Sequence, residues 1–344
     1  MHAYGPENWL EPSQLQLLFG YLPNLESTIR CSQFLQAEGL RYANQSMRRR
    51  QWHRSAFTSW PYNEPWPNAA HGCVVEHYGK PKMAYYYFKQ SCANVDISAV
   101  YPGLSCTTEN PLDLKLWVAN NLGQPLKGQS VRYRIYTTRK GIVVDQTKSI
   151  QDIESDKAVE VMNLNWRHME DSVGDVAMVY IELLAGDKTV TPRNLYTFGV
   201  QGPDNPLENL FPERKKIPLE KQRDVDQGRH LSEEIIKKAK SPLKALLSAP
   251  AAQLKLKTKW QQTKPRYMTA EIEVTNTSRN PALFVNLSAD IAEGARAYYS
   301  DNYFFLPPGE SRRVQLSINA DRAPSFKHPP KITATAWNCR HEKL

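Results

Sequence analysis

In two regions, Val95 to Gly199 and Leu254 to Trp337, the apolar residues recur with a period of two, and this alternation constrains the fold more than any other feature. Alternation places successive side chains on opposite faces of a strand, so that one face is apolar and the other polar. Short runs of this kind with turn residues between them predict two immunoglobulin-like β-sandwiches, over residues 94–200 and 251–344. We therefore expect a mostly β chain. The runs include Leu112–Val118, Val131–Ile135, Val176–Glu182, Met268–Val274, Leu283–Leu287, Val314–Ile318 and Ile332–Ala336.

Residues 1–93 have a different pattern, which begins with a long helix. Asn24 follows a proline and can cap a helix that runs to about Arg50. The middle of that helix is polar, with Gln36 and Glu38 among its residues, and buried polar groups need partners. Two readings stay open: the helix donates hydrogen bonds to neighbouring structure, or its middle turn is solvated.

A short strand and a second helix are expected to follow. Ser55–Tyr62 has the small and aromatic residues of a short buried strand, and Pro61 would end it because proline cannot donate to a ladder. Pro81 suits the first turn of a helix that runs to about Cys92. Helix, strand and helix together predict a piece of α/β architecture.

The loop after that strand has the residue types of a sugar site: Trp60, Asn63, Glu64 and Trp66. Aromatic faces cover the apolar C–H surfaces of a sugar, and amide and carboxylate groups bond its hydroxyls. The alternative for the two tryptophans is ordinary core packing.

Residues 201–250 carry six prolines among many charges and are expected to form a linker. Within it, Leu231–Lys240 could form a short helix, with acids near its start and lysines at its end.

Composition excludes several classes of protein. The formal charge is +9, but the basic residues are spread among 35 acids, so we expect no nucleic-acid partner. The spacing of the five cysteines matches no zinc pattern, and we expect neither a metal nor a cofactor. No apolar run is long enough for a bilayer and no signal peptide is visible, so no membrane partner is expected. Cysteine usage favours a reducing compartment, although a signal could lie upstream and the localisation is not fixed.

The sugar-site loop and several other strings resemble glycoside hydrolase family 2, in its β-mannosidase-like and exo-β-glucosaminidase-like branch. The family's last barrel strand typically ends in W-x-x-N-[DE]-x-W-P, which corresponds here to Trp60–Pro67. A D-Y-Y-G-x-P-K-x-A-Y-Y string follows in the family and corresponds to Glu76–Tyr86. Further family-like strings are Ser32–Arg41 on the long helix, Ser300–Phe304, Pro308–Glu310 and Ala336–Asn338.

The resemblance implies a retaining, exo-acting β-glycosidase whose catalytic (β/α)8 barrel precedes the sandwiches. Residues 1–93 would then be the end of that barrel, with its last helices and strand eight. The catalytic carboxylates of the family lie on strands four and seven, and are expected upstream of this chain. The implied partners are a β-linked glycan and the missing N-terminal barrel half, in cis or in trans.

Under this resemblance Trp60 would floor the subsite of the cleaved sugar, Trp66 would line its rim, and Asn63 and Glu64 would bond hydroxyls or position Trp60. Acid/base glutamates in related barrels often follow an asparagine, so Glu64 is also a candidate catalytic acid. Its surroundings match strand eight instead. Two departures from the family pattern remove possible sugar contacts: Pro61 stands where glutamine is common, and Glu76-His77 replaces Asp-Tyr.

A second hypothesis is a non-catalytic β-sandwich protein that binds carbohydrate or another protein. It would need an exposed aromatic platform on a sandwich face, for which Trp117, Trp166 and Trp260 are the candidates.

Overall fold

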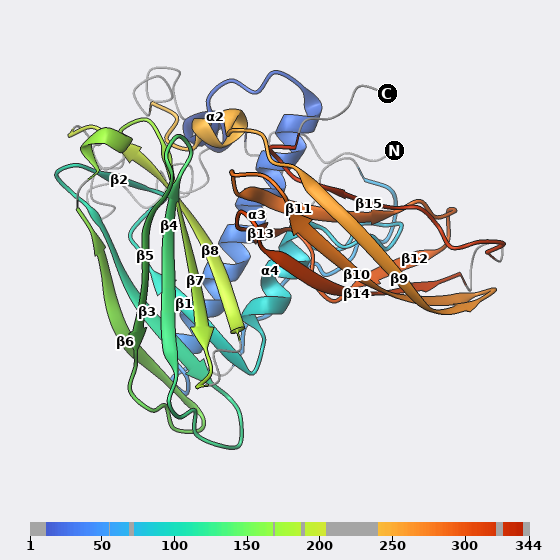
Figure 1. Ribbon diagram of the computed structural model, residues 1–344, viewed down its shortest axis with the longest axis horizontal. Helices are drawn as coiled ribbons and strands as arrows, with labels where there is room; N and C mark the ends of the chain where they lie inside the picture. The colour runs from blue at the N-terminus through green and yellow to red at the C-terminus, as the bar shows by residue number, and fades with distance from the viewer. Residues whose placement is uncertain are drawn as a thin grey trace, which may run out of the picture.

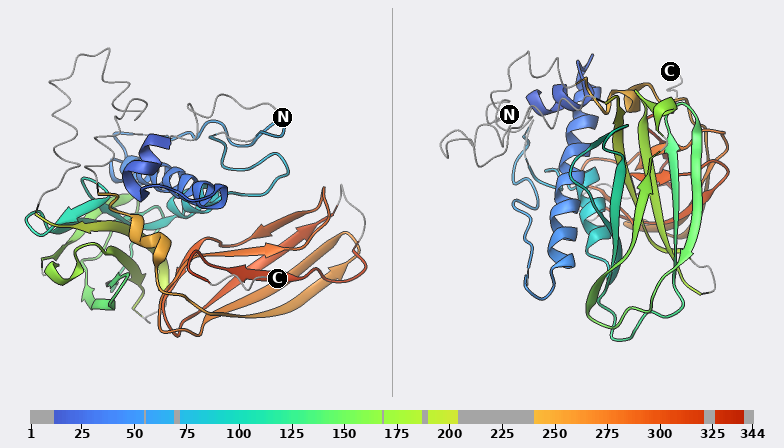
Figure 2. Two further views of the ribbon diagram at one scale, coloured as in Figure 1. Left: turned by 90° about the horizontal axis from the view of Figure 1, so that it is seen from above. Right: turned by 90° about the vertical axis from the view of Figure 1, so that its left-hand side faces the viewer.

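The computed structural model describes residues 12–54, 56–68, 72–167, 169–186, 190–203, 240–320 and 326–339. Two β-sandwiches stand side by side, and the helices lie along the junction between them (Figures 1 and 2). The prediction of a mostly β chain is confirmed. Within the described ranges the sheets are open and stacked, and none closes into a barrel. The same ranges contain no helix with the length and apolarity needed to cross a membrane.

The long helix begins where its sequence predicts. Asn24 is its N-cap, and the Asn24 side chain accepts a hydrogen bond of 2.9 Å from the backbone N–H of Ser27. The polar middle of the helix donates hydrogen bonds to its neighbours: Gln36 bonds the carbonyl of Gly72, and Gln45 bonds the buried carboxylate of Asp96. The first of the two readings of this helix is therefore correct. The helices are α2 (Pro12–Phe19), α3 (Leu25–Arg49) and α4 (Met83–Ser91).

The predicted strand at Ser55–Tyr62 is wrong. Residues 56–62 have no strand structure, and backbone pairing in this region is confined to single bridges such as Asn63 with Val75. A strand is stable only when a neighbour satisfies its N–H and C=O groups along its length. Here the segment around Val75 pairs only with the end of this run, and Pro61 offers no N–H.

The first sandwich packs a three-stranded sheet, in the order β1-β3-β6, against a five-stranded sheet, in the order β2-β8-β7-β4-β5. The predicted apolar run of β3, at Leu112, Leu114, Leu116 and Val118, points into the core between the sheets. The strands are β1 (Val95–Val100), β2 (Ser105–Thr107), β3 (Leu112–Asn120), β4 (Ser130–Thr137), β5 (Gly141–Ser149), β6 (Lys157–Trp166), β7 (Val176–Leu184) and β8 (Val190–Gln201), with a 3-10 turn η1 (Glu170–Ser172) before β7.

Strand β7 is buried on both faces, unlike the one-sided alternation predicted for Val176–Glu182. Its residues are apolar at almost every position, and a continuous apolar run of this kind is consistent with burial on both faces. One face, with Val179 and Ile181, packs in the core of the first sandwich. The other, with Met178 and Tyr180, belongs to a second core that it shares with the helices and with Phe305 of the second sandwich. The rings of Tyr180 and Phe305 lie 5.1 Å apart. The outer face of β7 is therefore the surface on which the rest of the molecule is assembled.

The second sandwich packs a sheet in the order β12-β14-β10-β9 against a sheet in the order β13-β11-β15. Ile272, Val274, Val314 and Leu316 fill its core from β10 and β14. The strands are β9 (Leu254–Lys264), β10 (Tyr267–Asn276), β11 (Ala282–Ala289), β12 (Arg296–Tyr299), β13 (Phe304–Leu306), β14 (Ser311–Asn319) and β15 (Ile332–Thr335).

Most of the predicted linker, including almost all of the predicted helix at Leu231–Lys240, lies outside the described residues. Its last part is well packed. A 3-10 turn η3 (Lys244–Ser248) follows Leu243, whose backbone N–H donates to the carbonyl of Leu18 at 2.7 Å. Leu243 and Leu246 are both buried in the shared core, so this part of the run connects the two sandwiches through packing.

The buried ion pair of Glu38 and Arg41 lies at the centre of the helical layer. Arg41 is 1% exposed, its Nη2 lies 2.6 Å from Glu38 Oε2, and its guanidinium is flanked by the rings of Tyr87 on α4 and Tyr196 on β8. The pair therefore joins both helices to the first sandwich.

Replacing Glu38 should destabilise the chain severely. The substitution Glu38→Gln leaves the buried guanidinium of Arg41 without a counter-charge, and we expect a loss of about 3–5 kcal/mol in the free energy of unfolding. Urea denaturation followed by circular dichroism measures it.

The matched control is Glu26→Gln on the same helix, because the Glu26 side chain is largely in solvent and its partner Arg30 is only half-buried. We expect that substitution to cost less than about 1 kcal/mol. Equal losses in the free energy of unfolding for the two variants would contradict a central structural role for the ion pair of Glu38 and Arg41.

Candidate functional site

The aromatic loop, which we define as residues 56–68 and 72–82, is held in a fixed path by its own backbone. Tyr62 C=O accepts hydrogen bonds from the N–H groups of Val74 and Val75 at 3.1 and 3.0 Å. Glu64 N–H donates to Val75 C=O at 3.1 Å, and Lys82 N–H donates to Val74 C=O at 2.9 Å. These bonds fold the segment back on itself without a sheet.

The helices fasten the aromatic loop from behind. From α3, the Gln36 amide donates to the carbonyls of Gly72 and Cys73. On the α4 side, the rings of Tyr62 and Tyr85 lie 6.5 Å apart, edge to face. A loop with two such attachments presents its remaining side chains in a defined direction.

Three of the four predicted site residues face solvent. Trp60 is 83% exposed and Trp66 is 47% exposed, and Asn63 between them is exposed as well. The alternative of core packing for the two tryptophans is therefore wrong in this structure. Exposed indoles with a neighbouring amide can stack on a sugar ring and bond its hydroxyls.

Glu64 points the other way and is only 7% exposed. In extended backbone adjacent side chains lie on opposite sides, so an outward Asn63 places Glu64 inside. There it makes a side-chain hydrogen bond with the thiol of Cys73, and it lies close enough to the Lys82 ammonium for their charges to interact. The structure separates Glu64 from the exposed group of three.

The electrostatics of this inner cluster follow from burial. Desolvation, with smaller contributions from the hydrogen bond and the charge of Glu64, raises the pKa of the Cys73 thiol to about 12. Burial lowers the pKa of the Lys82 ammonium, while the charges of Cys73, Glu64 and Glu76 oppose that change. A protonated thiol and a cation around one carboxylate make a structural cluster that fixes the turn under Asn63.

The remaining acids of the N-terminal part offer little for catalysis. Glu38 is committed to Arg41, Glu26 pairs with Arg30, and Glu7 and Glu11 lie outside the described residues. In the portion that the structure describes, no cluster of three or more metal-ligating side chains occurs.

The aromatic platform that a sandwich-based binding protein would need is not formed by the three predicted tryptophans. Trp166 is buried, and Trp117 and Trp260 are only partly exposed. The exposed indoles that the structure does present lie in the aromatic loop and at Trp52.

Reasoning from the sequence missed Cys73 and Lys82, the two residues that determine the role of Glu64. Neither has a local signal, because each meets Glu64 only after the loop has turned back through the bonds at Tyr62 and Val75.

Comparison with known families identifies the second sandwich. Residues 235–339 match the model of the exo-β-D-glucosaminidase Ig-fold domain. No curated protein matches the sequence.

Solved structures with a similar fold are glycoside hydrolases. The exo-β-D-glucosaminidase CsxA, in complex with an inhibitor, superposes with a TM-score of 0.69 at 15% identity, over 94% of this chain and 35% of that one. The exo-chitosanase CsxA of Amycolatopsis orientalis gives a TM-score of 0.68 at 16% identity, over 94% and 35%. The β-D-mannosidase of Dictyoglomus thermophilum gives 0.59 at 16% identity, over 95% and 31%.

This chain thus spans about a third of the length of those enzymes. It has the fold of their C-terminal portion, and residues 235–339 match an Ig-fold domain of the exo-β-D-glucosaminidase type. The resemblance to the β-mannosidase-like and exo-β-glucosaminidase-like branch of glycoside hydrolase family 2 is confirmed.

The cysteines provide a test of the inner cluster. At pH 8 a thiol with a pKa of about 12 is ionised in about one molecule in ten thousand, so Cys73 should react with iodoacetamide at least tenfold more slowly than exposed Cys92. Peptide mass spectrometry on the native chain measures both rates.

The substitution Glu64→Gln removes a negative charge and weakens the acceptor of the Cys73 hydrogen bond, and should speed alkylation of Cys73 several-fold. The control is Glu76→Gln, whose carboxylate acts on Lys82 instead. If Cys73 and Cys92 react equally fast in the unchanged chain, the cluster described here does not exist.

Proposed function

We propose that this chain is the C-terminal part of a retaining, exo-acting β-glycosidase of the β-mannosidase-like or β-glucosaminidase-like kind, which hydrolyses O-glycosyl bonds. In this proposal residues 1–93 complete a (β/α)8 barrel, and residues 94–200 and 251–344 are immunoglobulin-like sandwiches joined by a linker. The catalytic carboxylates are supplied from outside these 344 residues, in cis or in trans.

The observation that carries the proposal is the aromatic loop. Trp60 and Trp66 are large apolar side chains in solvent, on a loop that the structure holds by backbone bonds and by two helices. Exposed aromatic surface on an otherwise ordered loop is typical of a site that a ligand or another part of the protein covers. The Ig-fold match at residues 235–339 supports a glycosidase context for it.

In the proposed site the indole of Trp60 forms the floor of the subsite that binds the cleaved sugar. Asn63 forms a hydrogen bond with a hydroxyl, and Trp66 lines the rim. Glu64 acts as a positioning residue, because its carboxylate is engaged with Cys73 and Lys82 beneath Asn63. A retaining mechanism needs two carboxyl groups about 5–5.5 Å apart on the two sides of the scissile bond. A buried carboxylate with two partners of its own does not meet that need.

The second candidate is a non-catalytic protein that binds carbohydrate or another protein. The partial burial of Trp117 and Trp260 and the burial of Trp166 disfavour a binding platform on the sandwich faces. The exposed loop at Trp60 serves this candidate equally well, so the two are separated by turnover once the missing barrel half is supplied, which only the glycosidase part should then support.

The purified chain should not hydrolyse nitrophenyl β-mannoside, β-glucosaminide or β-galactoside, since its catalytic carboxylates are proposed to lie elsewhere. Release of nitrophenol is measured by absorbance, with the Glu64→Gln variant in parallel. Turnover by the unchanged chain that disappears in Glu64→Gln would make Glu64 a catalytic carboxylate and reject the proposal.

Removal of the Trp60 indole should weaken binding of a single sugar. For Trp60→Ala we expect the affinity for methyl β-mannoside or methyl β-glucosaminide, measured by calorimetry, to fall about tenfold because the stacking face is lost.

The matched control is Trp52→Ala. Trp52 is 64% exposed but lies outside the aromatic loop, where its ring N–H donates to Asp156 C=O at 3.2 Å. Equal effects of the two substitutions, or no effect of either, would count against a sugar subsite at Trp60.

A further inference from the structure

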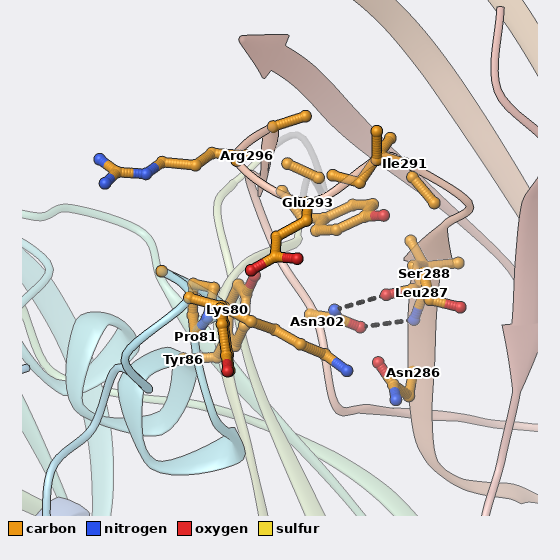
Figure 3. Close-up of a pocket in the computed structure, with 18 of the residues that line it drawn as sticks. Lys80, Pro81, Tyr86, Asn286, Leu287, Ser288, Ile291, Glu293, Arg296 and Asn302 are labelled. Carbon is orange, nitrogen blue, oxygen red and sulfur yellow. Dashed lines mark hydrogen bonds between the residues drawn. The ribbon is translucent and has the colours of Figure 1, made fainter. Parts of the chain in front are cut away.

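A cavity lies between the turn at residues 78–81, in the second part of the aromatic loop, and the second sandwich (Figure 3). Its volume is about 380 Å³, and none of the four predicted site residues lines it. This volume is within the range of about 300–1,000 Å³ typical of ligand sites.

The turn that forms one wall approaches the sandwich closely at a glycine. Gly79 has a φ of +81°, and a Cβ at this position would lie 3.1 Å from Nε of Arg296 on β12. The left-handed backbone and the close approach both favour glycine. Tyr78 and Lys80, the residues before and after Gly79, both line the cavity, and Tyr78 is 57% exposed.

Three polar side chains that line the cavity have no partner among the described residues. The side chains of Lys80, Asn286 and Glu293 make neither a hydrogen bond nor an ion pair with the part of the chain that the structure describes. Neighbouring Asn302 contrasts with them, because its amide bonds the backbone of Leu287 at 2.7 and 3.1 Å and accepts from the N–H of Tyr303 at 3.1 Å. In Figure 3 the Glu293 carboxylate points into the cavity and the Lys80 side chain extends across it in the direction of Asn286, while Arg296 points away.

We propose that this cavity is a second carbohydrate-binding site, distinct from the subsite proposed at Trp60, Asn63 and Trp66. A cation, an amide and a carboxylate supply donors and acceptors for several ring hydroxyls, and the exposed face of Tyr78 can cover the C–H surface of a sugar. A simple anion fits less well, because the Glu293 carboxylate faces the same space as the Lys80 ammonium. The site thus extends the second sandwich from scaffold to ligand-binding module.

The test uses the full chain with Trp60→Ala, which removes the proposed loop subsite and leaves the cavity intact. β-1,4-linked disaccharides of glucosamine and of mannose are the probes, titrated by calorimetry. Adding Glu293→Gln or Lys80→Met should each lower the affinity for the bound disaccharide about tenfold, the usual effect of losing a hydrogen bond to a charged group.

Two exposed residues of the same sandwich that do not line the cavity provide matched controls. Asp290→Asn makes the same charge change as Glu293→Gln, and Lys331→Met makes the same change as Lys80→Met. Neither control should alter the affinity. All four altered side chains are exposed, so we expect every variant to fold, and thermal unfolding checks this.

Failure to bind either disaccharide in the Trp60→Ala chain overturns the inference, and so does binding that Glu293→Gln and Lys80→Met leave unchanged. Binding of inorganic phosphate without either disaccharide also overturns it, in favour of an anion site at Lys80. These outcomes are distinct from failure of the proposed function, which is read from Trp60→Ala with single sugars.

Discussion

The molecule depends on the buried contact between Arg41, Glu38 and the rings of Tyr87 and Tyr196. An ion pair in a dry interior costs desolvation that only close geometry and further contacts offset, and here two aromatic faces flank the guanidinium. Because the four residues come from α3, α4 and β8, the pair fixes the helices on the first sandwich. The aromatic loop connects α3 with α4, so its position follows from the same contact.

A second polar junction nearby depends on pH. Asp96 on β1 accepts hydrogen bonds from Gln45 of α3 and Asn194 of β8, and burial raises the pKa of its carboxyl to about 6. A carboxyl whose pKa is higher in the folded than in the unfolded chain stabilises the fold when it is protonated. That contribution is complete below the unfolded pKa of about 4 and is lost as the pH rises through about 6. Asp96 therefore stabilises the junction between the helices and the first sandwich more in mild acid than at neutral pH.

The alternating runs predicted the two β regions because burial of one strand face is a local property, as in β3. The helix start at Asn24 was equally local. The second buried face of β7 has a local signal that the prediction of alternation did not use, because nearly all of its residues are apolar. The residues that cover this face, such as Phe305, lie far along the chain and have no such signal. The expected strand at 55–62 was wrong for a related reason. Its composition suits a strand, but strand structure requires a neighbour that the described chain provides only at Val75.

For the candidate site, the sequence identified the loop but not the separate tasks of its residues. Trp60 and Trp66 are exposed as a ligand site requires, whereas the role of Glu64 depends on Cys73 and Lys82, which reach it only in three dimensions. The family-like strings elsewhere have mainly structural tasks. Asp301 accepts from Gln90 of α4 at 2.9 Å, and Glu310 pairs with Arg134 of the first sandwich.

The strings that carried the resemblance therefore mostly describe how the two sandwiches and the helices are joined. A fold can match at 15% to 17% identity when few residues have to be kept. A small number of well-bonded polar residues at the junctions suffices to set the relative position of large apolar layers. In the proposed function, sugar specificity comes from side chains that these junctions leave free. Among the described residues, the candidates are the exposed indoles at Trp60 and Trp66 and the side chains of Lys80, Asn286 and Glu293 that line the cavity.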